Sequence, residues 1–108
     1  MRKTGLLFIG ELAKITGASV KSLRYYEQLG ILLPAYIDPG TNYRYYAFNQ
    51  IYLVDVILIC IEMDIKLKRL TDFIEDGIID YDRLLAFGEK IAEEKLIAVT
   101  KGLHALSI

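Results

Sequence analysis

The sequence predicts a mainly α-helical fold that contains one small β-hairpin and ends in a long helix. Three observations support this prediction. Apolar residues recur at helical spacing over 8–31, with an interruption at Gly17. Turn-forming residues at 38–42 separate two aromatic and β-branched segments, as is typical of a hairpin. Beyond residue 80, apolar residues recur every seven positions, as in a coiled coil. We expect two units, residues 1–77 and 78–108.

The segment FIGELAKITGASVKSLRYYEQLGIL predicts two short helices with a tight break between them. Gly17 is expected to cap the end of the first helix. Ser19 is expected to cap the start of the second, because its hydroxyl can accept a hydrogen bond from a free backbone amide. Gly30 would end the second helix. Its buried stripe is expected to contain Val20, Leu23 and Tyr26.

The segment AYIDPGTNYRYY predicts a two-stranded hairpin with a loose loop. Side chains alternate along a strand, so Tyr43 and Tyr45 share one face and Arg44 and Tyr46 the other. Tyr46 lies nearer the following helix and is expected in the core. Tyr43 fits either a buried or an exposed position.

Helical patterns return after the hairpin. Asn49 is expected to cap a buried helix in QIYLVDVILICIEM, and Asp64 to mark a turn. The segment KLKRLTDFIEDG predicts a further amphipathic helix that ends near Gly77. The last segment predicts a long helix with a heptad seam, incomplete because the matching earlier positions are Asp82 and Glu89. The residues of this seam are Leu85, Ala92, Leu96, Val99, Leu103 and Leu106.

The net charge of −1 conceals an asymmetry between the two halves of the chain. Residues 1–50 carry six cations and three anions, a net charge of +3. Residues 51–108 carry seven cations and eleven anions, a net charge of −4. This pattern suggests a basic contact surface followed by an acidic, solvated part.

Composition also limits the compartment. The richest apolar run contains Asp55 and is shorter than the roughly 20 residues of a transmembrane helix. The apolar stretch at residues 6–9 is too short for a signal peptide. We therefore expect no membrane contact and a cytoplasmic location. Cys60 is the sole cysteine, which excludes an internal disulfide, and its apolar neighbours predict that it is buried.

Two helices joined at a glycine and followed by a hairpin form the pattern of a winged helix-turn-helix, in which the second helix enters a DNA major groove. At about 100° per residue, the face opposite Val20 and Leu23 is cationic and polar. It presents Lys21, Ser22 and Tyr25, flanked by Arg24 and Gln28. The alternative is an ordinary solvated face. Arg44 on the hairpin is the expected wing contact to phosphate.

Residues 8–46 resemble the N-terminal DNA-binding domain of the MerR family of transcription regulators. The resemblance rests on the helix pair with LRYYE and on the later YRYY, and YIDPGTNYRYY looks most like multidrug-sensing members. It implies that the second helix and the wing grip phosphates and groove edges of an operator half-site. The implied DNA-binding residues are Ser19, Lys21, Arg24, Tyr25, Tyr43 and Arg44.

The resemblance further implies a homodimer on double-stranded DNA, built through the heptad seam, with an inverted-repeat operator. By distorting an overlong promoter spacer, such a dimer would act on RNA polymerase indirectly. Two positions depart from the family pattern: Ile61 replaces a frequent basic residue, and Asp64 a usual glycine. The sensor cysteines of metal-sensing members and a C-terminal ligand domain are absent from the sequence. The chain is expected to be a DNA-binding fragment or a natural short form.

No catalytic residue, cofactor or metal site is expected. His104 stands alone, the acidic run DFIEDGIIDYD lacks the spacing of a calcium loop, and Glu93-Glu94 has no companion nucleophile or base. Two alternatives to a transcription regulator remain. One is an excisionase-like accessory protein that binds DNA, and the other is a coiled-coil interaction module that does not.

Overall fold

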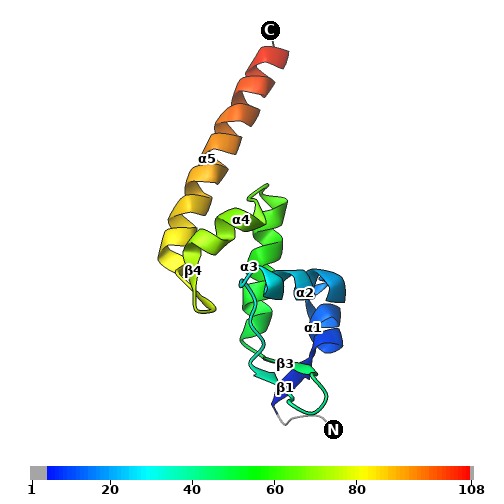
Figure 1. Cartoon of the computed structure of the whole chain (residues 1–108). Helices are drawn as coiled ribbons and strands as arrows, with labels where there is room; N and C mark the ends of the chain where they lie inside the picture. Colours follow the sequence, from blue (N-terminus) through cyan, green and yellow to red (C-terminus); the bar gives the residue numbers. More distant parts are fainter. Residues whose placement is uncertain (1–4, 108) are drawn as a thin grey trace.

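The computed structural model describes residues 5–107 and is elongated, with extents of 66 × 26 × 21 Å. A head of short helices and strands occupies one end, and a long helix projects from it (Figure 1). In chain order the elements are β1 (Leu6–Phe8), α1 (Ile9–Thr16), α2 (Val20–Gln28), β2 (Tyr36–Ile37), β3 (Arg44–Ala47), α3 (Gln50–Glu62), α4 (Leu67–Leu70), the 3-10 turn η1 (Thr71–Phe73), β4 (Ile74–Glu75), β5 (Ile78–Ile79) and α5 (Tyr81–Leu106).

The break between α1 and α2 forms as predicted. Gly17 adopts a left-handed conformation, with φ of 85°, and its amide donates to the carbonyl oxygen of Ala13 at 2.8 Å. The Ser19 Oγ accepts a hydrogen bond from the Ser22 amide at 3.0 Å and so caps α2. Leu23 and Tyr26 are buried as predicted, whereas Val20 is only partly buried.

The wing strands belong to a three-stranded sheet, not to the two-stranded hairpin that the sequence predicts. β3 is central, with β1 and β2 antiparallel on either side. Strand β1 was missed because three residues are too few to show an alternating pattern. Its pairing explains why both faces of β3 are covered: Tyr46 enters the core as predicted, and Tyr45 packs against the rings of Phe8 and Tyr36.

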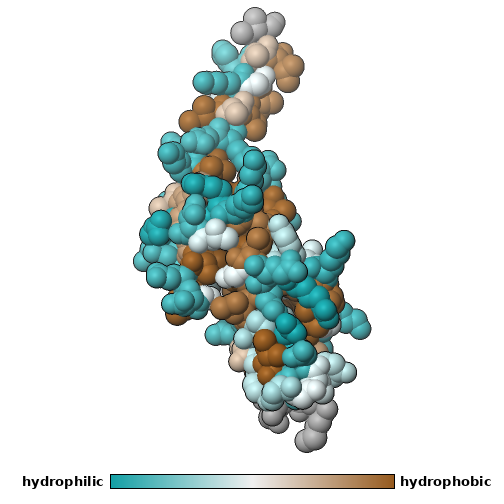
Figure 2. Space-filling model, viewed as in Figure 1, coloured by the Kyte–Doolittle hydropathy of each residue, from teal (hydrophilic) through white to brown (hydrophobic). Residues whose placement is uncertain are grey.

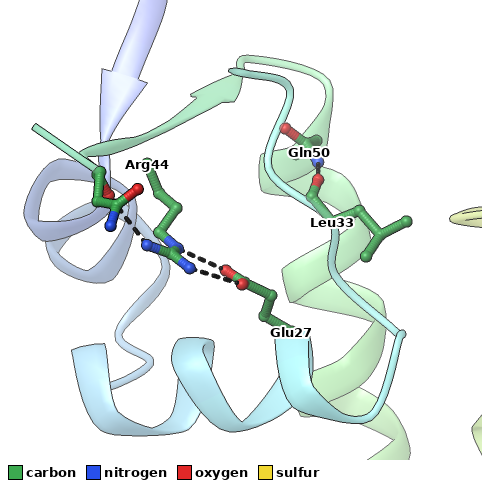
Figure 3. A network of polar contacts seen from close by, with 5 residues as sticks. Glu27, Leu33, Arg44 and Gln50 are labelled. Carbon is green, nitrogen blue, oxygen red and sulfur yellow. Dashed lines mark hydrogen bonds and ion pairs between the residues drawn. The ribbon is translucent and has the colours of Figure 1, made fainter. Parts of the chain in front are cut away.

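The start of α3 differs from the prediction, because no side-chain capping bond from Asn49 is present. Gln50 joins the strands to the helix instead. Its Oε1 accepts from the amide of Ala47 at 2.8 Å, and its Nε2 donates to the carbonyl oxygen of Leu33 (Figure 3). The Gln50 amide thus satisfies one backbone donor, on Ala47, and one backbone acceptor, on Leu33. The shorter side chain of Asn49 makes no such capping bond.

The predicted helix from Lys66 to Gly77 is wrong beyond Leu70. The chain passes through η1 and then forms the β4–β5 hairpin around Asp76 and Gly77, which have φ of 52° and 76°. An Asp-Gly pair between two short isoleucine-containing segments is a strong hairpin signal, and this local preference overrides the helical spacing. Asp64 forms the predicted turn, with φ of 60°.

The core of the head continues into the first turns of α5. The structure describes α5 over its whole length. Within this helix, only Leu84 is buried. The rings of Phe73 and Phe87 stack with centroids 5.3 Å apart, and Nζ of Lys95 bonds Oδ2 of Asp64 at 3.0 Å. Every residue from 92 to 107 is exposed. The C-terminal half of α5 therefore lacks cover from its own chain (Figure 1).

Candidate nucleic-acid interface

The outer face of α2 carries the predicted polar residues. Lys21, Arg24 and Tyr25 are exposed, and 47% of Tyr25 is open to solvent. Leu23 and Tyr26 hold the opposite face in the core. Two cations and a phenol thus occupy one side of a helix whose orientation is set by buried residues. Such a face can donate hydrogen bonds to phosphate oxygens and to base edges.

Ser19 lies at the N-terminal end of this face, but its hydroxyl is already in use. The Oγ accepts from the Ser22 amide and donates to the Ser22 Oγ at 2.9 Å. The side chain therefore orders the first turn of α2 and retains one acceptor lone pair.

The wing loop is held by its own side chains. Asp38 Oδ1 accepts from the amides of Gly40 and Thr41 at 2.8 and 3.1 Å, and the Asp38 amide donates to the carbonyl oxygen of Tyr43 at 2.9 Å. Tyr43 follows this loop and is 59% exposed. The open question about Tyr43 is resolved in favour of the surface.

A hollow of about 440 Å³ lies where the wing meets α2. Arg24 comes from α2, while Tyr43 and Arg44 come from the wing. The complete lining is Phe8, Ile9, Arg24, Thr41, Asn42, Tyr43 and Arg44. Three of the six predicted DNA-binding residues therefore border one concave surface, although 18 residues separate the first two in sequence.

The Arg44 guanidinium, which the sequence predicts as a phosphate contact, is bound to the carboxylate of Glu27 (Figure 3). Nε lies 3.0 Å from Oε1 and Nη2 lies 3.2 Å from Oε2, a bidentate pair, and Nη1 donates to the carbonyl oxygen of Asn42 at 2.9 Å. Hydrogen bonding and charge attraction from Glu27 raise the pKa of Arg44. Sequence reasoning missed Glu27, although it is the only acidic residue of the segment VKSLRYYEQ.

Tyr46 lies behind this ion pair in the core. Its hydroxyl is buried and has no hydrogen-bond partner among the described residues. Burial, followed by the negative charge of Glu27, raises the pKa of Tyr46 to about 12. In the run Arg44-Tyr45-Tyr46, the cation is therefore partly exposed, and the two rings are buried on opposite faces of β3.

Comparison with known proteins identifies this architecture. Residues 8–46 match the model of the MerR family regulatory protein. This segment is therefore similar to that of MerR-family regulators. The match spans α1, α2 and the wing, and so contains all six predicted DNA-binding residues.

Two curated MerR-type relatives show strong local similarity. The multidrug-efflux transporter 1 regulator of Bacillus subtilis is 47% identical over 49 residues, which are 45% of this chain and 18% of the relative. The transcriptional regulator BrlR of Pseudomonas aeruginosa is 36% identical over 75 residues, 69% of this chain and 28% of the relative. The chain thus matches less than a third of the length of each.

The fold is shared with HiNmlR, described as a MerR family regulator lacking the sensor domain and bound to promoter DNA. The TM-score is 0.68 at 18% identity, over 94% of this chain and 85% of that one. At this identity the likeness establishes the fold alone.

The MerR-like chain also carries a second, apolar surface. On α5, Leu85, Leu96 and Leu103 are between 62% and 66% exposed, Val99 is 56% exposed and Leu106 is 84% exposed. Figure 2 shows brown apolar side chains along this projecting helix, between teal hydrophilic ones. The structure therefore places the whole predicted seam at the surface of a single chain.

The base of this seam borders an apolar groove of about 460 Å³ between α3 and α5. Leu85 and Ala92 of the seam form part of one wall, and Cys60 lies in the other. The lining is Val56, Ile59, Cys60, Met63, Ile65, Tyr81, Asp82, Leu84, Leu85, Gly88, Glu89 and Ala92. Cys60 is buried as predicted, and burial raises the pKa of its thiol.

Two further features concern what the described chain lacks. Over residues 5–107, no helix combines the length and apolar character needed to cross a membrane. Within the same range, no three side chains of the His, Cys, Asp or Glu type gather closely enough to hold a metal ion. His104 is exposed near the end of α5.

Proposed function

We propose that the chain is a sequence-specific, double-stranded-DNA-binding transcriptional regulator that acts as a homodimer and distorts promoter DNA. The observation that carries this proposal is the hollow where α2 meets the wing, because Arg24, Tyr43 and Arg44 converge there from separate elements. A recognition helix flanked by a phosphate-binding wing is a known way to dock on a major groove.

The polar residues have distinct proposed roles. Arg24 pairs with a base edge or a phosphate, and Lys21 neutralises phosphate. The phenols of Tyr25 and Tyr43, together with the α2 start at Ser19, supply hydrogen bonds to the backbone of DNA. Arg44 contacts phosphate from the wing.

We propose that two copies pair through α5 in an antiparallel arrangement. The 26 residues of this helix span about 39 Å at 1.5 Å per residue. Each projecting C-terminal half would then cover the seam and the α3–α5 groove of its partner, which is the self-complementary contact of a two-fold dimer. The two heads would be separated by roughly one DNA turn, about 34–36 Å, so the operator would be an inverted repeat.

The remaining proposals follow from this role. Residues 1–77 would serve as the DNA-binding unit and 78–108 as the dimerisation unit. The protein would work in the cytoplasm without a cofactor or catalytic activity, and its influence on RNA polymerase would pass through the shape of the promoter. The MerR-type relatives are transcriptional regulators, which supports this assignment.

A selection experiment tests the proposal. The full chain is incubated with a library of random duplexes, bound DNA is recovered, and affinity for the enriched sequence is measured across a salt series. We expect an inverted repeat and a steep loss of affinity with rising salt, because phosphate contacts release counterions. No enrichment and no salt-dependent binding would overturn the proposal and favour a protein-interaction module.

A further inference from the structure

Glu27 occupies an unexpected place for an acidic residue. It lies in the last turn of α2, on the element proposed to enter the major groove, and its side chain is 23% exposed. A carboxylate beside a polyanion is repelled by it. On charge alone, neutralising Glu27 should strengthen binding to DNA.

The geometry around Glu27 indicates the opposite effect. Both carboxylate oxygens are engaged by Arg44, 17 residues away on the first position of β3. The pair joins the end of the recognition helix to the base of the wing (Figure 3). Because a bidentate guanidinium–carboxylate contact fixes direction as well as distance, it restricts how the wing sits relative to α2.

The same contact orders the Arg44 side chain. A guanidinium has five N–H donors, and Arg44 uses three of them: two on Glu27 and one on the carbonyl oxygen of Asn42. One N–H on each Nη atom is left for a further acceptor. An arginine held in this way loses less rotamer entropy when it binds a phosphate than a free one does.

We propose that Glu27 is a positioning residue for DNA binding, which acts through Arg44 by orienting its two remaining N–H groups and by holding the wing against the recognition helix. This inference rests on the proposed function, since it concerns the same surface. Its distinguishing consequence is a reversal of sign: removal of this negative charge weakens binding to a polyanion.

The first experiment compares Glu27→Gln with a matched control, Glu62→Gln. Glu62 is exposed on α3 and takes part in none of the ion pairs found among the described residues. Full-length proteins are titrated with the selected operator and with a mixed-sequence duplex. We expect Glu27→Gln to lose about fivefold in operator affinity, the scale of a partly exposed ion pair, and Glu62→Gln to bind as well as the unmodified chain or better.

A double-mutant cycle separates positioning from general structural damage. In an Arg44→Gln background the carboxylate has nothing to orient, so adding Glu27→Gln should cost nothing and should slightly strengthen binding. A residue needed only for folding would cost the same in both backgrounds. Circular dichroism melts accompany each variant. If Glu27→Gln fails to fold, Glu27→Asp, which keeps the charge but withdraws the carboxylate by one methylene, takes its place. It should weaken operator binding in the otherwise unmodified chain and leave binding unchanged in the Arg44→Gln background.

The inference is overturned if the Glu27 variant binds the operator as tightly as the unmodified chain or more tightly, or if its loss persists in the Arg44→Gln background. Failure of the proposed function has a different signature, because the unmodified chain itself would then show no salt-dependent binding to either duplex.

Discussion

The α2–wing surface and the C-terminal half of α5 are both exposed, but they are built in opposite ways. The first is polar and draws its residues from several elements, held by a buried helix face, by the Asp38 turn and by the Glu27–Arg44 pair. The second is an apolar row on a single helix, exposed from residue 92 onward.

This difference shows what each surface requires. The α2–wing surface has its shape in the free chain, so in the proposed complex DNA would meet side chains that are already placed. The seam on α5 leaves large apolar side chains in water, which a monomeric protein rarely does with so many neighbouring residues. We therefore expect the first surface to be complete in a single chain and the second to be complete only in a pair.

The largest expected effect comes from breaking the apolar surface alone. Replacing Leu96 and Leu103 together with aspartate should produce a monomer that keeps its helix content, because neither side chain contributes to the buried core. Operator affinity should fall about a hundredfold or more, since each half-site loses the avidity of its neighbour. Sedimentation and gel-shift titration measure the two effects. A variant that stays dimeric would show that another surface joins the chains.

The next effect concerns base reading by the α2–wing surface. Arg24→Ala should weaken operator binding by roughly 1–3 kcal/mol and relax the sequence preference at one position in each half-site. The cause is loss of an exposed guanidinium from α2. Repeating the selection with the variant checks the preference. Unchanged affinity and preference would remove Arg24 from the interface.

Arg44→Ala should have a smaller effect that does not depend on sequence. Loss of one phosphate contact should reduce the salt slope by about one per protomer, for operator and mixed-sequence duplex alike. A loss confined to the operator would mean that the wing reads bases.

The smallest effect is expected in the core behind the wing. Tyr46→Phe removes a buried hydroxyl without a hydrogen-bond partner among the described residues, so it should raise the free energy of unfolding by about 1 kcal/mol. Because the pKa of Tyr46 is about 12 when folded and 10.0 ordinarily, the folded state holds the proton more tightly. Ionisation of Tyr46 therefore leaves the free energy of unfolding unchanged below pH 10 and lowers it as pH rises from 10 toward about 12, because the unfolded chain loses this proton first. Urea melts should show that the variant loses less stability over this window.

Local signals in the sequence were sufficient for one part of the fold. The cap at Gly17, the cap at Ser19 and the wing turn each depend on residues within a few positions of one another, and all were predicted. The place of Tyr46 near the following helix also predicted that it is buried, and seven-residue spacing predicted the seam, which is exposed in the single chain. These features need no knowledge of distant elements.

The features that sequence reasoning missed depend on distant partners. Strand β1 is recognisable only from its pairing with β3, and the role of Glu27 only from Arg44, 17 residues away. The β4–β5 hairpin is a different kind of error. Its Asp-Gly signal was present in the sequence, but helical spacing was given more weight. Whether a predicted DNA-contacting side chain is free or is bound to another residue depends on the tertiary structure, as Arg44 and Glu27 show.

The contrast between a surface complete in one chain and a surface complete only in two is tested most directly by the stoichiometry of the DNA complex. Sedimentation velocity of the full chain, at micromolar concentration, is measured alone and with the selected operator. We predict a dimer in the absence of DNA and two chains on each duplex. A chain that remains monomeric and saturates the operator at one copy per duplex, with undiminished affinity, would contradict it.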